Sequence, residues 1–356
     1  MSSPKKVRQI TALKLVLTFL SGLTGGCVFW ALGLPLPWML GCLTGSLIAS
    51  LSGIPVGVTK PVRLIIMVIL GVMLGGTFSP EVLARAGEWI PTLIAAVLYL
   101  AILTFIAQFY CRKFIKMDRL TAIFAGFPGG LSEMTLLGEE AGADVPALTL
   151  AHACRVATIL LAIPLFLTYW SGLEIVEQGT SAPLWSSVDI LILLILALGG
   201  LFLGKIAKFP AYQLTGPLLL SAIVHTGGFV QGEPPEIVTI LLQLTLGSAL
   251  GARFAGYSLG QVGRLMLLSI IMAFLMLAVT LVVSGALSYA FDLEFEALIL
   301  ALSPGGFAEM TLAALSMGID PAFVTTHHAL RLLVIVFIVP VFLARIIKRQ
   351  NKRKQD

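Results

Sequence analysis

The sequence predicts an all-α polytopic membrane protein made of two inverted repeats. Three observations support this fold class: an apolar composition, an internal duplication and an uneven distribution of positive charge. Of 356 residues, 58% are hydrophobic and 12% are charged, and the mean hydropathy is +1.00. Soluble domains carry about 25% charged residues. Most side chains must therefore face lipid or other buried helices.

The duplication relates two stretches that lie 176 positions apart. FPGGLSEM, which starts at Phe127, aligns with SPGGFAEM, which starts at Ser303. Unrelated apolar helices share Leu and Ala, but these two stretches share polar and conformationally special residues, so the chain is a tandem duplication. The residues that recur in register are Gly71, Gly75, Pro128, Gly129, Gly130, Glu133, Met134, Thr135, Gly142, Asp144, His152 and Arg155, which align with Gly247, Gly251, Pro304, Gly305, Gly306, Glu309, Met310, Thr311, Gly318, Asp320, His328 and Arg331.

The duplication defines the domain organisation. We assign residues 1–170 to the first repeat, 171–187 to a polar linker, 188–346 to the second repeat and 347–356 to a basic tail. Each repeat is expected to hold four apolar helices, a broken segment that carries Pro-Gly-Gly, and a fifth helix. The expected helices are 10–32, 37–53, 62–78, 89–111 and 146–169, then 188–207, 212–230, 236–254, 265–290 and 321–344, with broken segments at 119–141 and 296–317.

The positions of Lys and Arg predict the topology. If each broken segment enters and leaves the membrane on one side, 20 of the 23 Lys and Arg lie inside and only Arg85 lies outside. If the segments cross, Lys205, Lys208, Arg253 and Arg264 join Arg85 outside. The positive-inside rule favours the re-entrant arrangement, with about ten spans and cytoplasmic termini. Five crossings per repeat is an odd number, so the second repeat is inverted, as in many secondary transporters.

The Pro-Gly-Gly breaks at 128–130 and 304–306 are the first candidates for function. Proline removes a backbone N–H, and glycine adopts conformations closed to other residues. Broken backbone at membrane depth is tolerated inside protein or against a water-filled cavity. The residues after each break can start a half-helix whose free N–H groups attract an anion. The alternative is a tight turn that only lets helices pack closely.

Buried charge supplies the second group of candidates. Arg155 and Arg331 lie about nine residues into the last helix of each repeat, which is roughly 13 Å at about 1.5 Å per residue and so near the midplane. His152 and His328 precede them by three positions and share their helix face. Glu133 and Glu309 can carry a proton, coordinate a cation, or cap the half-helix.

Two interpretations of these charges remain open. In the first, inversion brings both Arg, both His and both half-helices around one site for a small anion such as a carboxylate. In the second, Glu133 pairs with Arg155 and Glu309 with Arg331, and nothing is bound. Thr135, Thr311 and Ser132 can add hydroxyl ligands. The predicted substrate- or ion-binding residues are thus Gly129, Gly130, Ser132, Glu133, Thr135, His152, Arg155, Gly305, Gly306, Glu309, Thr311, His328 and Arg331.

Other polar residues receive structural roles or none. Asp144 and Asp320 precede the last helix of each repeat and are expected to be N-caps. His225 and His327 are unpaired in the repeat and receive no role. The chain shows no HExxH, GxSxG or P-loop pattern, so we predict no catalytic residue, metal or cofactor, and an enzyme is disfavoured. The basic residues lie in short clusters between apolar segments, so nucleic acid is not expected as a partner.

The combination of LPLPWMLG at 34–41, PGGLSEM, GADV at 142–145 and the HxxR of His152 and Arg155, with its second copy, resembles the bacterial AbrB-type membrane protein family. The resemblance covers nearly the whole chain. It implies a role proposed for the family in regulating gene expression, unrelated to the DNA-binding AbrB regulators. It also implies an ammonia monooxygenase label, which finds no support in a copper or iron ligand pattern.

The repeated layout is also similar in architecture to the sodium-coupled glutamate and citrate transporter families. We therefore expect a secondary transporter of a small anionic metabolite in the bacterial inner membrane, coupled to an ion and working by alternating access. Its expected partners are the lipid bilayer, the substrate and a second copy of the chain. The alternatives are a membrane-embedded regulator that acts through a partner protein and, less favoured, a monooxygenase.

Overall fold

The computed structural model describes residues 4–170, 184–230 and 232–337, apart from the side chains of 4–11, Ser132, Glu133 and Gln261. Within these ranges every regular element is a helix, and an isolated bridge joins Leu184 to Glu233. The linker expectation for 171–187 falls mostly outside the described residues, and the expectation for the tail falls wholly outside them. Six helices are long and apolar enough to cross a membrane: Ala12–Ala31, Pro80–Ile115, Val145–Trp170, Ser187–Ile206, Glu236–Phe254 and Val262–Phe291. The protein is therefore an all-helical membrane protein.

The helices recur in the same order in the two repeats. The first repeat contains α1 (Pro4–Ala31), η1 (Pro37–Gly41), α2 (Cys42–Leu51), α3 (Lys60–Gly75), α4 (Pro80–Arg85), η2 (Ala86–Trp89), α5 (Ile90–Tyr110), η3 (Cys111–Ile115), α6 (Arg119–Gly126), α7 (Leu131–Ala141) and α8 (Val145–Trp170). The second contains α9 (Ser187–Ile206), α10 (Tyr212–Thr226), α11 (Glu236–Gly251), η4 (Ala252–Phe254), α12 (Leu259–Phe291), α13 (Phe295–Leu302), α14 (Phe307–Ser316) and the helix Pro321–Phe337. The bounds of α3 and α11, and of α6 and α13, differ by the same 176 residues as the sequence repeat.

Each broken segment consists of two short helices separated by the Pro-Gly-Gly turn. Asp118 caps α6 by accepting hydrogen bonds from the N–H groups of Leu120 and Thr121. Pro128 lacks the N–H that would continue α6, and Gly130 then becomes the N-cap of α7. The half-helices α6 and α7 pack against each other, as do α13 and α14. Each pair therefore has the form of a hairpin.

The predicted capping roles of Asp144 and Asp320 are confirmed. The Asp144 carboxylate accepts a hydrogen bond from the N–H of Ala147 at 3.1 Å. The Asp320 carboxylate accepts from the N–H groups of Ala322 and Phe323. These bonds satisfy N–H groups that have no partner within the helix, so both residues fix the start of the last helix of their repeat.

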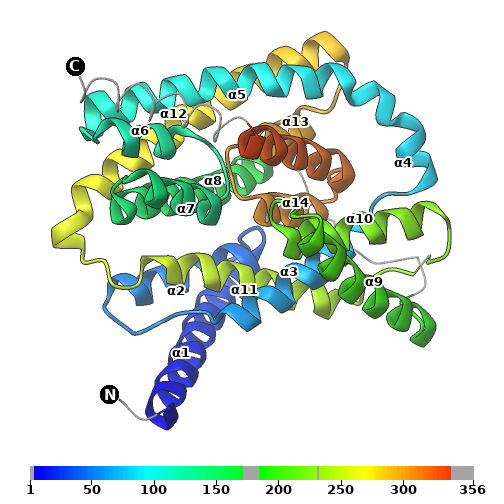
Figure 1. The fold of residues 1–356 in the computed structure, drawn as a ribbon, viewed down its shortest axis with the longest axis horizontal. Helices are drawn as coiled ribbons and strands as arrows, with labels where there is room; N and C mark the ends of the chain where they lie inside the picture. The colour runs from blue at the N-terminus through cyan, green and yellow to red at the C-terminus, as the bar shows by residue number, and fades with distance from the viewer. Residues whose placement is uncertain (1–3, 171–183, 231, 338–356) are drawn as a thin grey trace.

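The helices form two bundles, and each bundle contains equivalent elements from both repeats. In the first bundle, α1, α2 and α3 pack with α9, α10 and α11 (Figure 1, lower part). In the second, α5 runs beside α12 above α6, α7 and α8, with α13, α14 and the helix Pro321–Phe337 alongside (Figure 1). Between the bundles, α14 packs on α3 and α11, and α8 packs on α11 and η4.

Glycines set the close helix contacts of the first bundle in a reciprocal way. A Cβ on Gly71 of α3 would collide with the carbonyl oxygen of Leu214 on α10. A Cβ on Gly247 of α11 would collide with the carbonyl oxygen of Met39 on η1. In this part of the chain the repeats align at an offset of 175, which places Gly41 on Gly216, so Met39 is the residue equivalent to Leu214. Thus α3 packs on α10 as α11 packs on η1 and α2. Such an exchange between repeats is the pattern that two-fold pseudosymmetry produces.

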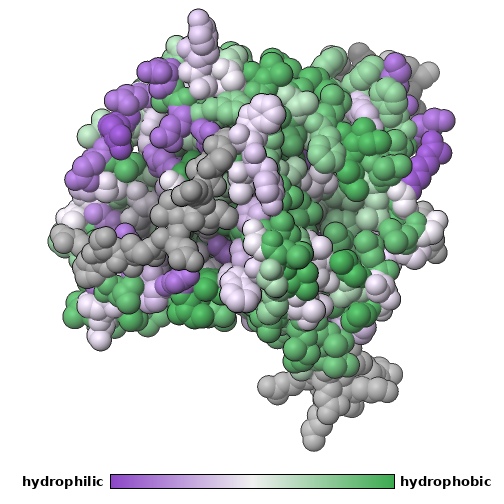
Figure 2. Space-filling view, turned by 180° about the vertical axis from the view of Figure 1, so that it is seen from behind, coloured by the Kyte–Doolittle hydropathy of each residue, from purple (hydrophilic) through white to green (hydrophobic). Residues whose placement is uncertain are grey.

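A large part of the outer surface is apolar, as lipid contact requires. Figure 2 shows a broad hydrophobic face with hydrophilic side chains toward its margins. On α5 one helical stripe of large apolar side chains is more than half exposed: Ile94, Leu98, Ile102, Phe105 and Phe109. The opposite face of α5, which includes Tyr99 and Leu103, is buried. A stripe of this size would be costly in water, and it supports burial in the hydrocarbon core.

Candidate functional site

A cavity of about 380 Å³ lies between the two bundles. Its walls come from α3, α10 and η4 on one side, and from both Pro-Gly-Gly breaks, α14 and the helix Pro321–Phe337 on the other. Lys60 and Arg63 in its wall are exposed, whereas Glu309 is 6% exposed. The cavity therefore leads from the surface to a buried carboxylate.

Both breaks contribute their turn and the start of the following half-helix. The lining residues from these regions are Pro128, Gly129, Gly130, Leu131, Gly305, Gly306, Phe307, Ala308 and Glu309. Gly130 and Gly306 are the N-caps of α7 and α14, and both have extended backbone. The first N–H that bonds within α14 is that of Met310, which donates to Gly306. The positive ends of the two helix dipoles thus lie at one cavity.

The glycines of the second break leave room for the side chains of the following half-helix, and Glu309 lies against Gly306. A Cβ on Gly306 would collide with the Glu309 carboxylate, and a Cβ on Gly305 would lie 2.7 Å from the Met310 side chain. Glu309 occupies the first turn of α14, where a negative charge is favourable. Its carboxylate therefore borders the cavity beside the helix N-terminus.

The two membrane arginines hold the two breaks through identical hydrogen bonds. Arg155 donates from Nη1 to the carbonyl of Phe127 and from Nη2 to that of Gly129, each at 3.1 Å. Arg331 donates in the same way to the carbonyls of Ser303 and Gly305, the latter at 2.8 Å. Because the helix is broken, these carbonyls accept no hydrogen bond within a helix. Each guanidinium supplies the missing donors for the carbonyls of its own turn.

The equivalent arginines differ in their access to the cavity. Arg331 lines it and is half-buried, whereas Arg155 is 0% exposed and lies outside it. Likewise His328 lines the cavity, and its Nε2 lies 3.0 Å from the carbonyl of Leu300, while the equivalent His152 is buried elsewhere. The ring of Phe307 stacks on His328, with centroids 6.1 Å apart. Of these two equivalent Arg–His pairs, only the pair of the second repeat thus borders the cavity.

The structure brings together seven of the residues that the sequence singled out. Those that line the cavity are Gly129, Gly130, Gly305, Gly306, Glu309, His328 and Arg331. Thr311 lies outside it and bonds back to its own helix at Phe307. Thr135, His152 and Arg155 also lie outside it. The side chains of Ser132 and Glu133 lie outside the described residues, although the start of α7 that carries them is at the cavity.

In the second repeat, the interpretation that Glu309 pairs with Arg331 does not hold. Between the two described residues Glu309 and Arg331 there is no ion pair, although both line the cavity. Two of the guanidinium nitrogens of Arg331 donate to backbone carbonyls instead. For Glu133 and Arg155 the pairing stays a prediction, because the Glu133 side chain is not described.

Sequence reasoning missed a basic wall of the cavity. Lys60 and Arg63 at the start of α3, and Arg253 in η4, line it together with Gln213 of α10. The equivalent positions in the other repeat are Glu236, Thr239 and Thr77, so the duplication gave no signal for them. The available signal was their membership of the basic clusters that the positive-inside rule assigns to the cytoplasmic side. With Arg331, the described side chains of the cavity wall include four cations and one carboxylate, that of Glu309.

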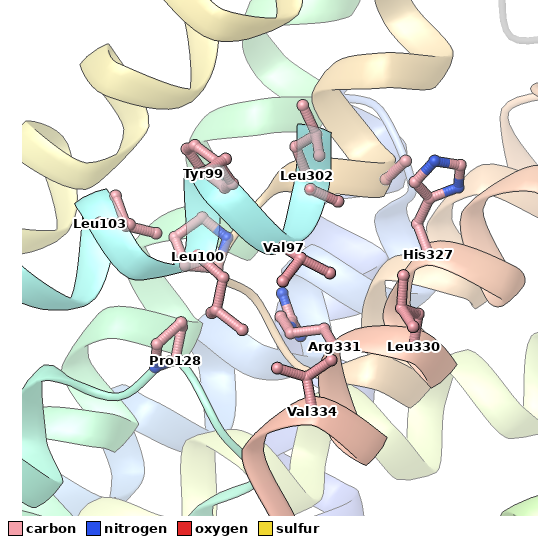
Figure 3. A pocket seen from close by; sticks show the side chains of 13 residues that line it. Val97, Tyr99, Leu100, Leu103, Pro128, Leu302, His327, Leu330, Arg331 and Val334 are labelled. Carbon is pink, nitrogen blue, oxygen red and sulfur yellow. The ribbon is translucent and has the colours of Figure 1, made fainter. Parts of the chain in front are cut away.

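A second, small pocket of about 20 Å³ lies behind Arg331, between α5 and the helix Pro321–Phe337 (Figure 3). It has room for about one water molecule. His327, which had no assigned role, lines it, and its Nε2 lies 3.0 Å from the hydroxyl of Thr92. Arg331 and Pro128 line both cavities. Among the described residues, no group of three or more His, Cys, Asp and Glu is placed to hold a metal ion.

Comparison with known proteins places the chain in a family. The family model described as "Transition state regulatory protein AbrB" matches residues 38–347. The chain is 26% identical over 93% of its length to "Uncharacterized protein YhjN" of Bacillus subtilis (strain 168), of which the match covers 92%. It is 23% identical over 88% of its length to "Putative regulator AbrB" of Escherichia coli (strain K12), of which the match covers 90%. The resemblance seen in the motifs is thereby confirmed, and this helical membrane protein belongs to the AbrB family.

Proposed function

We propose that the protein is a secondary transporter that moves a small anionic metabolite by alternating access, coupled to an ion. The observation that carries this proposal is the shared cavity: the broken segments of two repeats meet at one site, and the side chains described there include four cations and one carboxylate. Interrupted helices that meet near the midplane are the usual site of substrate and coupling ion in such transporters.

The composition of the wall supports an anionic substrate. Lys60, Arg63 and Arg253 attract negative charge, and the start of α14 offers N–H groups that α14 itself does not use. Two nitrogens of Arg331 already donate to backbone carbonyls, so Arg331 contributes to anion binding mainly through its charge. We assign substrate binding to these cations and to the starts of α7 and α14.

Glu309 is the candidate for coupling. It is buried beside the substrate region and has no ion pair with Arg331 among the described residues. A carboxylate within a membrane segment, facing a cavity, is suited to carry a proton or a cation. By its aligned position, Glu133 is the corresponding candidate in the first repeat.

The size of the cavity fits a metabolite and excludes a macromolecule. About 380 Å³ lies within the range of roughly 300–1,000 Å³ of small-molecule sites. The volume accommodates a compact mono- or dicarboxylate with several waters, since a water occupies about 30 Å³ of liquid.

We further propose that the repeats are inverted, with about ten spans in the bacterial inner membrane and both termini cytoplasmic. The half-helices α6 and α13 have 8 residues each, about 12 Å, which is far less than the roughly 30 Å of a bilayer core. Their packing against α7 and α14 supports two re-entrant hairpins. Lys60 and Arg63 then place the cavity mouth on the cytoplasmic face.

The test is a thermal-shift screen of purified protein against small carboxylates, phosphorylated metabolites, amines and neutral sugars. A ligand that binds the folded state raises the melting temperature by mass action. We expect carboxylates or other anions to stabilise the protein, and uptake of the hit into proteoliposomes to follow. Stabilisation by amines or sugars alone would contradict an anion transporter.

Arg63→Ala and Arg264→Ala form a matched pair for this screen. Both arginines are exposed, but only Arg63 lines the cavity. We expect Arg63→Ala to weaken the stabilisation by the anion about tenfold or more in ligand concentration, the equivalent of about 1.4 kcal/mol. Arg264→Ala should leave it unchanged. Equal effects would mean that only the overall charge matters.

The second candidate function is a membrane-embedded regulator. It is favoured by the word "regulator" in the name of the Escherichia coli relative and by the description of the family model. Such a protein would act through a partner that docks on the basic cytoplasmic loops. Affinity purification from membranes tests it: a stoichiometric partner that Arg112→Ala or Lys113→Ala releases would support it, and purification without one would weaken it.

A further inference from the structure

Two residues that line the cavity have equivalents in the other repeat that are buried outside it in the structure. The repeat register relates Met67 of α3 to Gln243 of α11, and Arg331 to Arg155 of α8. Met67 and Arg331 line the cavity and are half-buried. Gln243 is 6% and Arg155 0% exposed, and both lie outside it. Equivalent residues therefore exist in an open and a closed arrangement within one molecule.

The contacts of the half-helices account for the difference. In the second repeat α14 packs on α11, and the side-chain nitrogen of Gln243 donates a hydrogen bond of 2.7 Å to the hydroxyl of Ser316 near the end of α14. In the first repeat α7 packs on α6 and α8 of its own bundle. The residues equivalent to Gln243 and Ser316 are Met67, which faces the cavity, and Glu140, which is exposed. The half-helix α14 thus packs against α11 of the first bundle, whereas α7 leaves the equivalent position on α3 open to the cavity.

We propose that the protein has a second cavity, opening on the opposite face, in a conformation where the repeats exchange these arrangements. Its lining would be Gln243, Ile240, Met39 and Arg155, the counterparts in the duplication of Met67, Leu64, Leu214 and Arg331, which line the first cavity. In that conformation α14 leaves α11, the Gln243–Ser316 bond breaks, and α7 closes against α3. The inference rests on the proposed function only in that both cavities serve one ligand.

The two conformations are expected to differ little in free energy, so the exchange can run in both directions. Aligned segments of the duplication build the two half-helix contacts, so closing one offsets the opening of the other. The bond that must break joins two neutral side chains, so its net contribution to stability is small. The two bundles also keep their internal glycine contacts, such as that of Gly247 with the Met39 carbonyl, because these lie within the first bundle. The motion is therefore a displacement of one bundle against the other.

Cysteine labelling tests the second cavity without any knowledge of the substrate. Among the four cysteines only Cys27 is exposed, so Cys27→Ser gives a suitable background. In it, Met67→Cys and Gln243→Cys are treated with a membrane-impermeant thiol reagent on one or the other face of membrane vesicles. We expect labelling from opposite faces, with Gln243→Cys slower by about tenfold or more if its open state is the minor one. Leu250→Cys, buried on the same helix, should stay unlabelled.

Cross-linking provides the second measurement. A short bifunctional thiol reagent should join Gln243→Cys to Ser316→Cys in the conformation described here, and Met67→Cys to Glu140→Cys in the exchanged one. Labelling of Gln243→Cys from the same face as Met67→Cys would overturn the proposal. So would folded protein in which Gln243→Cys never reacts or the second pair never cross-links.

The outcome is separable from that of the proposed function. Two-sided labelling without any stabilising anion would preserve the second cavity and remove the assigned substrate. Anion uptake with one-sided labelling would preserve the transporter and overturn the exchange of arrangements.

Discussion

Arg155 and Arg331 make the same pair of hydrogen bonds to the carbonyls of their own Pro-Gly-Gly turn, yet only Arg331 borders the cavity. Each therefore stabilises a break, and one of them also supplies charge at the candidate site. This separates a structural role from a binding role in chemically identical residues.

The first prediction concerns these arginines. Arg155→Ala leaves two buried carbonyls without partners and should lower the free energy of unfolding by about 3 kcal/mol or more. Arg331→Ala should cost less, about 2 kcal/mol or below, because cavity water can reach the freed carbonyls. Thermal unfolding in detergent measures both. An equal loss of unfolding free energy would show that water reaches the carbonyls at Arg331 no better than those at Arg155.

The second prediction concerns the reciprocal glycine contacts. Gly71→Ala and Gly247→Ala each place a methyl group against a backbone carbonyl of the neighbouring helix and should destabilise the protein by about 1–3 kcal/mol. Gly263→Ala is the control. It lies in α12 with open space around its Cβ position and should stabilise by about 0.5–1 kcal/mol through helix propensity. If only one of the two glycines is sensitive, the packing is not reciprocal.

The third prediction concerns the buried histidine of the small pocket. Thr92→Val removes the hydroxyl 3.0 Å from Nε2 of His327 and leaves that nitrogen unpaired, at a cost of about 1–3 kcal/mol. Thr245→Val should cost less, because the hydroxyl of Thr245 bonds only to the carbonyl of Leu241 in its own helix. Thermal stability of the two variants gives the comparison. Equal losses would mean that the Thr92–His327 contact contributes nothing.

The fourth prediction concerns the helix caps. Asp144→Ala and Asp320→Ala should each cost about 1 kcal/mol, and Asp144→Asn and Asp320→Asn should recover most of it, since Asn caps as well as Asp. Thermal unfolding again measures the effect. Failure of Asn to recover stability would assign the loss to charge instead of capping.

The fifth prediction concerns topology. Lys60→Cys and Lys205→Cys should react with an impermeant maleimide from the cytoplasmic face, and Arg85→Cys from the other. All three native side chains are exposed. Reaction of Lys205→Cys together with Arg85→Cys would mean that the broken segments cross, and the repeats would then run parallel.

The repeat register predicted much of the fold because it compares residues under the same physical constraint. The broken segments expected at 119–141 and 296–317 span α6 with α7 and α13 with α14. The register could not predict the state of each copy, because equivalent sequences occupy different conformations when they pack against different neighbours. Hence both arginines were assigned to one site, and only one lies there.

The basic wall escaped prediction for a different reason. Lys60, Arg63 and Arg253 are charged residues near helix ends, and such residues usually only mark the cytoplasmic side. Their part in the cavity depends on how α3 and η4 face the second bundle, a tertiary relationship that no local pattern encodes. The π-helical turn η1, whose N-cap Leu36 has φ 45°, likewise left no trace in the hydrophobic periodicity.

If a second mouth opens as proposed, the difference between the two mouths has a kinetic consequence. The residues equivalent to Lys60 and Arg63 are Glu236 and Thr239, so a mouth formed on the opposite face would lack the cationic funnel. Long-range attraction raises encounter rates and is screened by salt within about 8–10 Å. An anion would therefore half-saturate the carrier at a lower concentration from one compartment than from the other, and added electrolyte would shrink that difference. A duplicated architecture can in this way yield a protein whose apparent affinity for the anion differs between the two sides of the membrane.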